Sequence, residues 1–103
     1  MEAIGWATMH EIEPRIYEED GIAIGPAFVG KGFGKQILNA LCDEASRCGA
    51  REFRSGHRMK NIASAKLLES CGFKYDYDSE EKTDPRTGEK YIIRNLKKEF
   101  CFT

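Results

Sequence analysis

The sequence predicts one small domain of mixed α/β (α+β) class, with a mixed sheet and elements in the order β-β-α-β-α-β-β. Three observations predict it. Several short segments alternate apolar and polar residues, which is typical of strands, whereas two longer segments repeat apolar residues every three or four positions, which is typical of helices. The links between these segments are short, which favours helices packed directly on a sheet.

Length and charge restrict the classes of function. The chain has 103 residues, enough for a single domain with one modest core. Its formal net charge is −1, so overall charge does not favour a nucleic-acid or membrane partner. No apolar run is long enough to cross a bilayer, and the first residues lack the pattern of a signal peptide. We therefore expect residues 1–103 to form one cytoplasmic domain.

The cysteines favour reduced thiols rather than a metal site. Cys42, Cys48, Cys71 and Cys101 form no Cys-x-x-Cys pair and no zinc-binding spacing. The first three fall within helical patterns, where cysteine usually acts as a small buried apolar residue. We expect no bound metal.

The first half of the chain predicts a hairpin and a helix. Residues 3–12 and 16–24 read as strands joined by a turn at residues 13–15, and Gly21 inside the second strand predicts a bulge. Residues 32–48 carry the apolar stripe of a buried helix, and Gly49 is suited to end it.

The second half predicts a strand, a helix and a final hairpin. Residues 51–57 form a short strand, which we expect to pair in parallel with an earlier one. Asn61 is a natural N-cap for the second helix, which ends at Gly72. In the next strand Phe73, Tyr75 and Tyr77 alternate with polar residues and predict one half-buried face. Residues 79–88 read as a charged loop, and residues 91–96 as the last strand.

A glycine-rich turn, with Gly25, Gly30, Gly32 and Gly34, lies between the second strand and the first helix. It predicts a phosphate site, because the first N–H groups of a helix are unpaired and can bind an anion. The Gly-x-Gly-x-x-Gly fingerprint of dinucleotide-binding proteins requires a third glycine at position 35, where this chain has Lys35. A P-loop fits from Gly25 to Lys31, but Gly32 replaces the hydroxyl residue that binds magnesium. The remaining alternatives are the pyrophosphate loop of an acetyltransferase and an ordinary junction whose glycines serve geometry alone.

Two motifs in the correct order carry a family resemblance. Residues 30–38, Gly-Lys-Gly-Phe-Gly-Lys-Gln-Ile-Leu, resemble motif A of the GNAT acetyltransferase superfamily. Residues 61–73 resemble motif B, with Asn61, Ser64, an apolar pair and Gly-Phe at the end. The resemblance spans residues 4–96 and looks closest to the branch that acetylates N-terminal amines of ribosomal proteins.

The resemblance implies acetyl-CoA as the cofactor, held where the strand 16–24 separates from the strand 51–57. Backbone groups of the first strand would bind the pantetheine arm, the glycine-rich turn would bind the pyrophosphate, and the second helix would approach from the other side. The residues implied are Ile22, Ala23, Ile24, Val29, Gly30, Lys31, Gly32, Phe33, Gly34, Lys35, Asn61 and Lys66.

The resemblance also implies a reaction, the transfer of acetyl to a primary amine, either an N-terminal amine or a small-molecule amine, by direct attack. Glu19 is the candidate base and Tyr75 the candidate acid. Two positions depart from the family pattern: Val29 replaces a Gln or Arg, and Leu68 stands where many relatives have a tyrosine. A CoA-binding module without turnover is therefore the alternative, and a nucleotide-phosphate binder is a second one.

The resemblance implies that the family's N-terminal strand and two helices, which build the acceptor site, are lacking. Their absence would leave a sheet edge and an apolar face exposed, and such surfaces seek partners. We therefore expect a homodimer.

Overall fold

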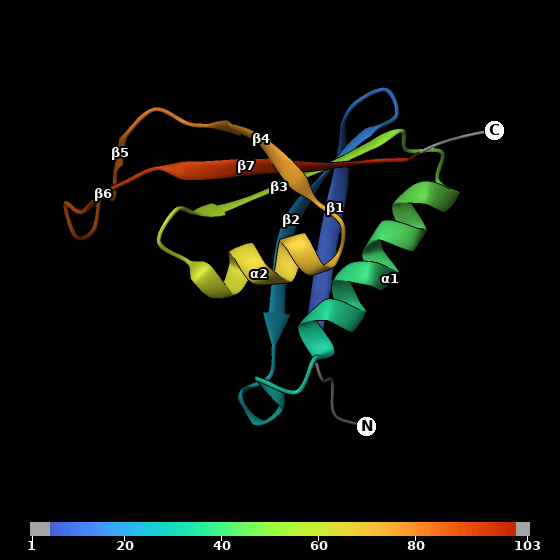
Figure 1. The fold of residues 1–103 in the computed structure, drawn as a ribbon, viewed down its shortest axis with the longest axis horizontal. Coiled ribbons are helices and arrows are strands. Elements are labelled where there is room, and N and C mark those ends of the chain that lie inside the picture. The colour runs from blue at the N-terminus through green and yellow to red at the C-terminus, as the bar shows by residue number, and fades with distance from the viewer. Residues whose placement is uncertain (1–4, 101–103) are drawn as a thin grey trace.

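The computed structural model describes residues 5–100, which form one five-stranded sheet, two helices and a short two-stranded hairpin (Figure 1). In chain order the elements are β1 (Gly5–Glu13), β2 (Ile16–Ile24), the 3-10 helix η1 (Pro26–Phe28), α1 (Phe33–Arg47), β3 (Glu52–Arg58), α2 (Ile62–Ser70), β4 (Lys74–Asp78), β5 (Lys82–Thr83), β6 (Lys90–Tyr91) and β7 (Ile93–Glu99).

The strands lie in the order β1-β2-β3-β7-β4. β2 and β3 are parallel, and the other neighbours in this sheet are antiparallel. The predicted mixed sheet is confirmed, and so is the predicted order of its strands and helices along the chain, to which the structure adds β5 and β6. No helix in the described part of the chain is long and apolar enough to cross a membrane.

The hairpin of β5 and β6 corrects one prediction, because the sequence indicated only a loop over residues 79–88. Asp84 organises this segment: it is 7% exposed, and its carboxylate accepts the Arg86 N–H at 2.8 Å and an Arg58 N–H at 3.2 Å. These bonds hold the pKa of Asp84 below its usual range. A turn built around a side chain therefore brings two short strands into register, which periodicity does not reveal.

Both helices cover the same face of the sheet. Buried residues of α1 and α2 pack in one cluster with buried residues of the strands, and the rings of Phe53 and Phe73 meet edge to face at 5.7 Å. Figure 1 shows the two helices lying side by side across the sheet. Among residues 5–100 no helix covers the opposite face, where Trp6 is 57% exposed.

The predicted face of β4 is wrong in part. Phe73 is buried, but Tyr75 and Tyr77 are 58% and 57% exposed. The ladder between β4 and β7 shifts register between these two tyrosines, so an irregularity moves Tyr77 to the other face of the sheet. Strict alternation cannot continue through such a shift, which explains why the pattern of the sequence misassigns this strand.

Candidate functional site

The parallel strands β2 and β3 pair at one end and separate at the other. Their ladder joins Ile16 to Glu52, Tyr17 to Phe53 and Glu18 to Arg54, and within the described residues it ends there. β2 continues to Ile24 with β1 on its other edge, and β3 continues to Arg58. The predicted separation of the two strands is confirmed, and we call the opening between them the wedge.

A bulge in β2 lies at the start of the wedge. Thr8 pairs with Gly21 and Met9 pairs with Glu19, so Asp20 is an extra residue in β2. A bulge bends its strand and increases the local twist, and this one comes two residues after the last β2 residue that pairs with β3. The bulge predicted from Gly21 is confirmed, one residue before that glycine.

Two cavities open onto the wedge and share Glu19, Ser55 and Gly56 as lining residues. The smaller, of about 40 Å³, lies on the helix side and is lined by Ile22, Leu38, Ser64, Leu67 and Leu68. The larger, of about 340 Å³, includes Arg54, which alternates along β3 with buried Phe53 and Ser55 and therefore faces away from the helices. The wedge thus joins two cavities on opposite faces of the sheet.

Glu19 is the ionisable group at the junction of these cavities. Burial raises the pKa of its carboxyl group, and the nearby charges of Asp20 and Glu18 raise that pKa further. A carboxylate with a raised pKa is better matched to accepting a proton near neutral pH. The predicted base therefore lies where a group entering from either cavity would meet it.

The glycine-rich turn leads into α1 with its backbone open. Gly30 and Gly32 have φ values of 80° and 82°, and apart from each glycine and its chain neighbours no described residue lies within 4 Å of where their Cβ atoms would be. Gly32 is the N-cap of α1 and has no side chain to occupy the first N–H groups of the helix. Lys31 and Lys35 are exposed beside these donors. Open N–H groups, the helix dipole and two cations together fit a phosphate.

The acetyltransferase (GNAT) family model matches residues 2–73. The chain belongs to this family. In this GNAT chain the matched region contains β1 to α2, and therefore the wedge, both cavities' shared residues and the glycine-rich turn.

Two curated relatives are similar to part of the chain. The L-methionine sulfoximine/L-methionine sulfone acetyltransferase of Salmonella typhimurium is 42% identical over 55 residues, covering 53% of this chain and 32% of that protein. The L-amino acid N-acyltransferase MnaT of Escherichia coli is 36% identical over 64 residues, covering 62% of this chain and 34% of that protein. The matches therefore span about a third of each relative's length.

Solved structures show the same fold. An acetyltransferase from Bacillus subtilis in complex with CoA matches with a TM-score of 0.83 at 22% identity, covering 97% of this chain and 71% of that one. The putative acetyltransferase yncA from Salmonella typhimurium with its cofactor acetyl-CoA has the same TM-score at 26% identity. That match covers 93% of this chain and 57% of the yncA chain. The ribosomal-protein-S18-alanine N-acetyltransferase from Escherichia coli matches with a TM-score of 0.80 at 22% identity, covering 94% of this chain and 61% of that one. At this identity the match shows a shared fold alone, so membership of the ribosomal branch stays a prediction.

The two cofactor candidates at α2 of this GNAT chain lie at the start and in the middle of the helix. Asn61 is the N-cap, and its Oδ1 accepts the Ser64 N–H at 3.1 Å. Its side-chain N–H₂ is therefore the group left to contact a ligand. Lys66 is exposed, and neither residue lines either cavity of the wedge. The start of α1 does approach α2, because a Cβ on Gly34 would lie 3.6 Å from a methyl group of Leu67.

Tyr75 does not line the wedge. It lies with His57 on a third cavity, of about 500 Å³, between α2 and the strands β3, β4 and β7, where the Arg94 guanidinium is 5.2 Å from its ring. The structure brings Tyr77 to the wedge instead, on the larger cavity with Glu19. Reasoning from the sequence missed Tyr77, because the irregularity in β4 that turns it has no marker such as glycine or proline.

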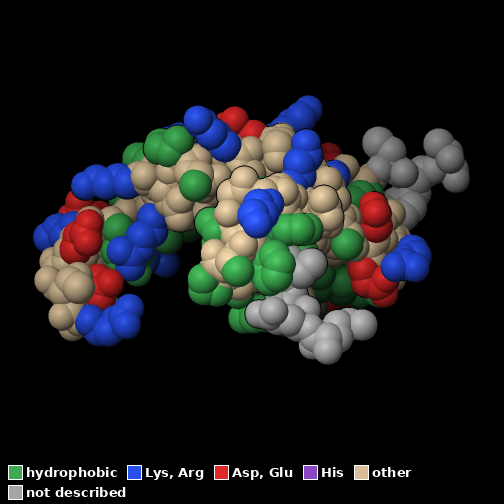
Figure 2. Space-filling model, turned by 90° about the horizontal axis from the view of Figure 1, so that it is seen from below, with side chains coloured by type: hydrophobic (Ala, Val, Ile, Leu, Met, Phe, Trp, Pro, Cys, Tyr) green, Lys and Arg blue, Asp and Glu red, His purple; other side chains and the backbone are tan. Residues whose placement is uncertain are grey.

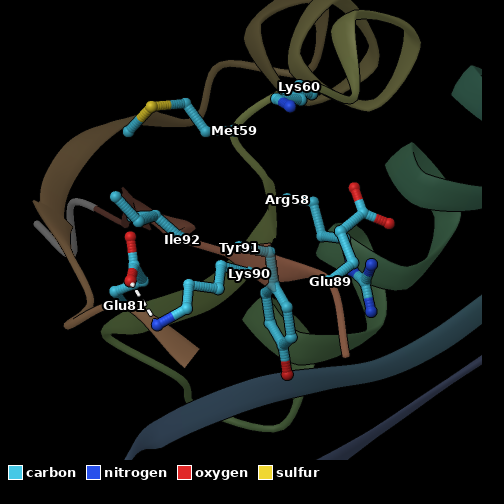
Figure 3. A pocket seen from close by; sticks show the side chains of 8 residues that line it. All are labelled: Arg58, Met59, Lys60, Glu81, Glu89, Lys90, Tyr91 and Ile92. Carbon is cyan, nitrogen blue, oxygen red and sulfur yellow. Dashed lines mark ion pairs between the residues drawn. The ribbon is translucent and has the colours of Figure 1, made fainter. Parts of the chain in front are cut away.

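A fourth cavity, of about 250 Å³, lies beside the β5–β6 hairpin. Figure 3 shows its lining residues, with Lys90 paired to Glu81 at 3.4 Å. The Arg58 guanidinium lies over the Tyr91 ring at 4.0 Å, a cation–π contact that ties the hairpin to the end of β3. In the described part of the chain this fourth cavity shares no lining residue with the two cavities of the wedge. Figure 2 shows the surface hollowed between this hairpin lobe, at left, and the glycine-rich turn.

Proposed function

We propose that the chain transfers an acetyl group from acetyl-CoA to a primary amine at the wedge. The observation that carries this proposal is the meeting of two cavities, from opposite faces of the sheet, at Glu19, Ser55 and Gly56. A cofactor on the helix side and an amine on the other side would meet at those residues. Family membership supports the reaction type, and the two structural neighbours named with CoA or acetyl-CoA support the cofactor.

The residues of the chain fit this cofactor. The edge of β2 at Ile22, Ala23 and Ile24 has no strand partner on the wedge side within residues 5–100, so its backbone groups can bind the amides of a pantetheine arm. The turn from Val29 to Gly32 and the first residues of α1, from Phe33 to Lys35, would hold the pyrophosphate. When bound, acetyl-CoA supplies an activated thioester.

Three side chains have roles in this proposal. Glu19 accepts a proton from the amine, which keeps the attacking nitrogen neutral. Ser55 lines both cavities, and its hydroxyl can donate a hydrogen bond to a developing negative charge. Tyr77, which lines the larger cavity, replaces Tyr75 as the tyrosine we propose to face the reacting groups.

The second candidate function is a CoA-binding module without turnover. Leu68 favours it, because this residue lines the small cavity where many family members place a tyrosine that donates a proton, and leucine has no proton to donate. Incubation with radiolabelled acetyl-CoA and a panel of amines separates the two. Acetylated amine supports the transferase. Tight cofactor binding with no acetylated product would support the module.

We further propose that two copies of the chain associate. β1 is an edge strand of the sheet, and Trp6 on it is 57% exposed on the face that no described helix covers. A second copy would cover both features. Sedimentation equilibrium at tens of micromolar should give the mass of a dimer. A monomeric mass for well-folded protein would contradict the association and leave the reaction unaffected.

A further inference from the structure

The larger cavity of the wedge, which we call the acceptor cavity, is lined by an excess of carboxylates. Glu18, Glu19, Asp20 and Asp76 contribute to its wall, whereas Arg54 is the basic residue among its described lining. Asp20 pairs with His10, and Asp76 lies 3.9 Å from Lys97. Within residues 5–100 no ion pair involves Glu18 or Glu19.

Arg54 offsets this charge only in part, because its guanidinium also pairs with a carboxylate outside the cavity. Its Nε donates to Glu52 at 2.9 Å, and that hydrogen bond raises the pKa of Arg54. Glu52 lies outside the cavity lining, and its side chain is only 16% exposed, so the pair is partly shielded from water. A ligand carboxylate could still accept from the Nη groups of Arg54, but it would meet a guanidinium whose charge Glu52 already balances in part.

Ser55 provides an independent indication that a polar ligand enters here. The residue is 7% exposed and lines both cavities of the wedge. Within residues 5–100 no side-chain nitrogen or oxygen atom is both fully buried and without a hydrogen-bond partner. The hydroxyl of Ser55, which bonds to no described group, is therefore open to the wedge, where a polar group of a ligand can bond to it.

We propose that the acceptor carries a second cationic group and no carboxylate near its reacting amine, as a linear diamine does. This inference rests on the proposed function of the wedge. One amine would reach Glu19 and Ser55, while the second, as an ammonium group, would lie among the carboxylates of the outer wall. An amino acid would instead bring its α-carboxylate against like charges. The chain would thus differ from the two curated relatives, whose names specify L-methionine derivatives and L-amino acids.

Three amines of equal chain length test the charge preference. The full chain is assayed with acetyl-CoA and, separately, 1,4-diaminobutane, butylamine and 4-aminobutanoate, and kcat/KM is measured for each. We expect the diamine to exceed 4-aminobutanoate by about tenfold or more, with butylamine between them, because each partly exposed charge contact contributes a factor of about two to five. A value for 4-aminobutanoate equal to or above that of butylamine would overturn the inference.

A binding measurement separates this inference from the proposed function. Backbone NMR spectra of the chain with CoA are recorded during titration with the same three amines. Diamine-induced shifts at residues 18–20 and 76–77, without turnover of any amine, would mean that the acceptor cavity is correct and the transferase is not. Turnover at similar rates for all three amines would support the transferase and overturn the charge preference. Neither turnover nor binding would contradict both.

Variants of the outer wall complete the test. Glu18→Gln and Asp76→Asn should each lower the ratio of kcat/KM for diamine over butylamine by about threefold, because each removes one charge from the wall. Glu80→Gln is the matched control, since Glu80 is an exposed residue of the loop before β5 and does not line the cavity. An unchanged ratio in both wall variants would overturn the assignment of the outer wall.

Discussion

The two ends of the β2–β3 pair differ in what they do. At the closed end the ladder joins Tyr17 to Phe53, and Phe53 is fully buried in the core beneath the helices. At the open end the same strands separate around Glu19, Ser55 and Gly56, and cavities lie on both faces. One pair of strands thus contributes to the core over its first residues and to the proposed reaction site over its last ones.

The difference arises from backbone geometry rather than from composition. The bulge at Asp20 bends β2 after its last pair with β3, and the glycine-rich turn then leads the chain away into α1. Backbone groups that would have completed a ladder are left available to a ligand. Changes at the closed end should therefore affect stability, and changes at the open end should affect binding and turnover.

The largest expected effect is at the closed end. Phe53→Ala should lower the free energy of unfolding by about 3–5 kcal/mol, because it removes a fully buried ring that packs against Phe73. Urea denaturation measures this value. Val29→Ala is the control at the open end, where the side chain is 66% exposed, and it should change stability by less than about 0.5 kcal/mol. Similar losses in both variants would contradict the division between the ends.

The next largest effect is on turnover. Glu19→Gln should lower kcat by about 100-fold, because glutamine cannot accept the proton of the amine, while acetyl-CoA affinity stays within about threefold. Steady-state kinetics and calorimetry measure the two quantities. A variant that keeps more than a tenth of the wild-type kcat would remove Glu19 from the role of base.

The same variant makes a prediction about stability with a definite sign. Because folding raises the pKa of Glu19, the native state disfavours its ionised form, and this cost is present above the folded pKa and absent below the unfolded pKa of about 4.3. Glu19→Gln should therefore be at least as stable as the wild type at pH 7, and the difference should vanish as pH falls below about 4. Urea denaturation at both pH values measures it, and a variant less stable at pH 7 would contradict the direction of the pKa shift.

A smaller effect is expected at the start of α1. Gly34→Glu should weaken acetyl-CoA binding by about 30-fold, because its carboxylate would occupy the N–H groups proposed for pyrophosphate. The fold should persist, since Gly34 is not at a positive φ and a Cβ would meet Leu67 at an ordinary 3.6 Å. Gly34→Ala is the matched control and should bind within about threefold of the wild type. Equal affinity in all three proteins would mean that the turn does not hold the phosphates.

The smallest effect is at the start of α2, where Asn61 serves as a cap. Asn61→Ala should cost about 1 kcal/mol of stability, because the Ser64 N–H loses its acceptor. Asn61→Asp keeps that acceptor and should be as stable as the wild type, but it replaces the side-chain N–H₂ and should weaken acetyl-CoA binding by about threefold if that group contacts the cofactor. Loss of stability in Asn61→Asp would contradict the capping role.

Most of the fold could be predicted from the sequence, because its elements follow simple periods and end at recognisable residues. The alternation of β2, the apolar stripe of α1 and the Asn61 cap each appear in the structure where the pattern indicates. The exceptions are the Asp84-centred hairpin, which Arg58 of β3 holds by a hydrogen bond, and the irregularity in β4, where the ladder with β7 shifts register. These features depend on contacts between distant segments, which local periodicity does not report.

The candidate site was predictable to a smaller extent. Gly32 and Gly34 could be chosen as candidates because phosphate binding demands backbone freedom at fixed spacing, and Glu19 because it precedes a glycine in a strand expected to bulge. Tyr77 and Ser55 could not, because their positions depend on how β4 and β3 meet the wedge. The carboxylates of the outer wall come from β2 and β4, which lie far apart in the sequence.

Calorimetric titration of the chain with acetyl-CoA tests most directly whether the open end of β2 and β3 is a cofactor site. We predict binding of micromolar strength, about −8 kcal/mol, with Gly34→Ala close to the wild type and Gly34→Glu clearly weaker. No detectable binding of acetyl-CoA to the folded wild-type chain at millimolar concentration, about −4 kcal/mol, would contradict the account.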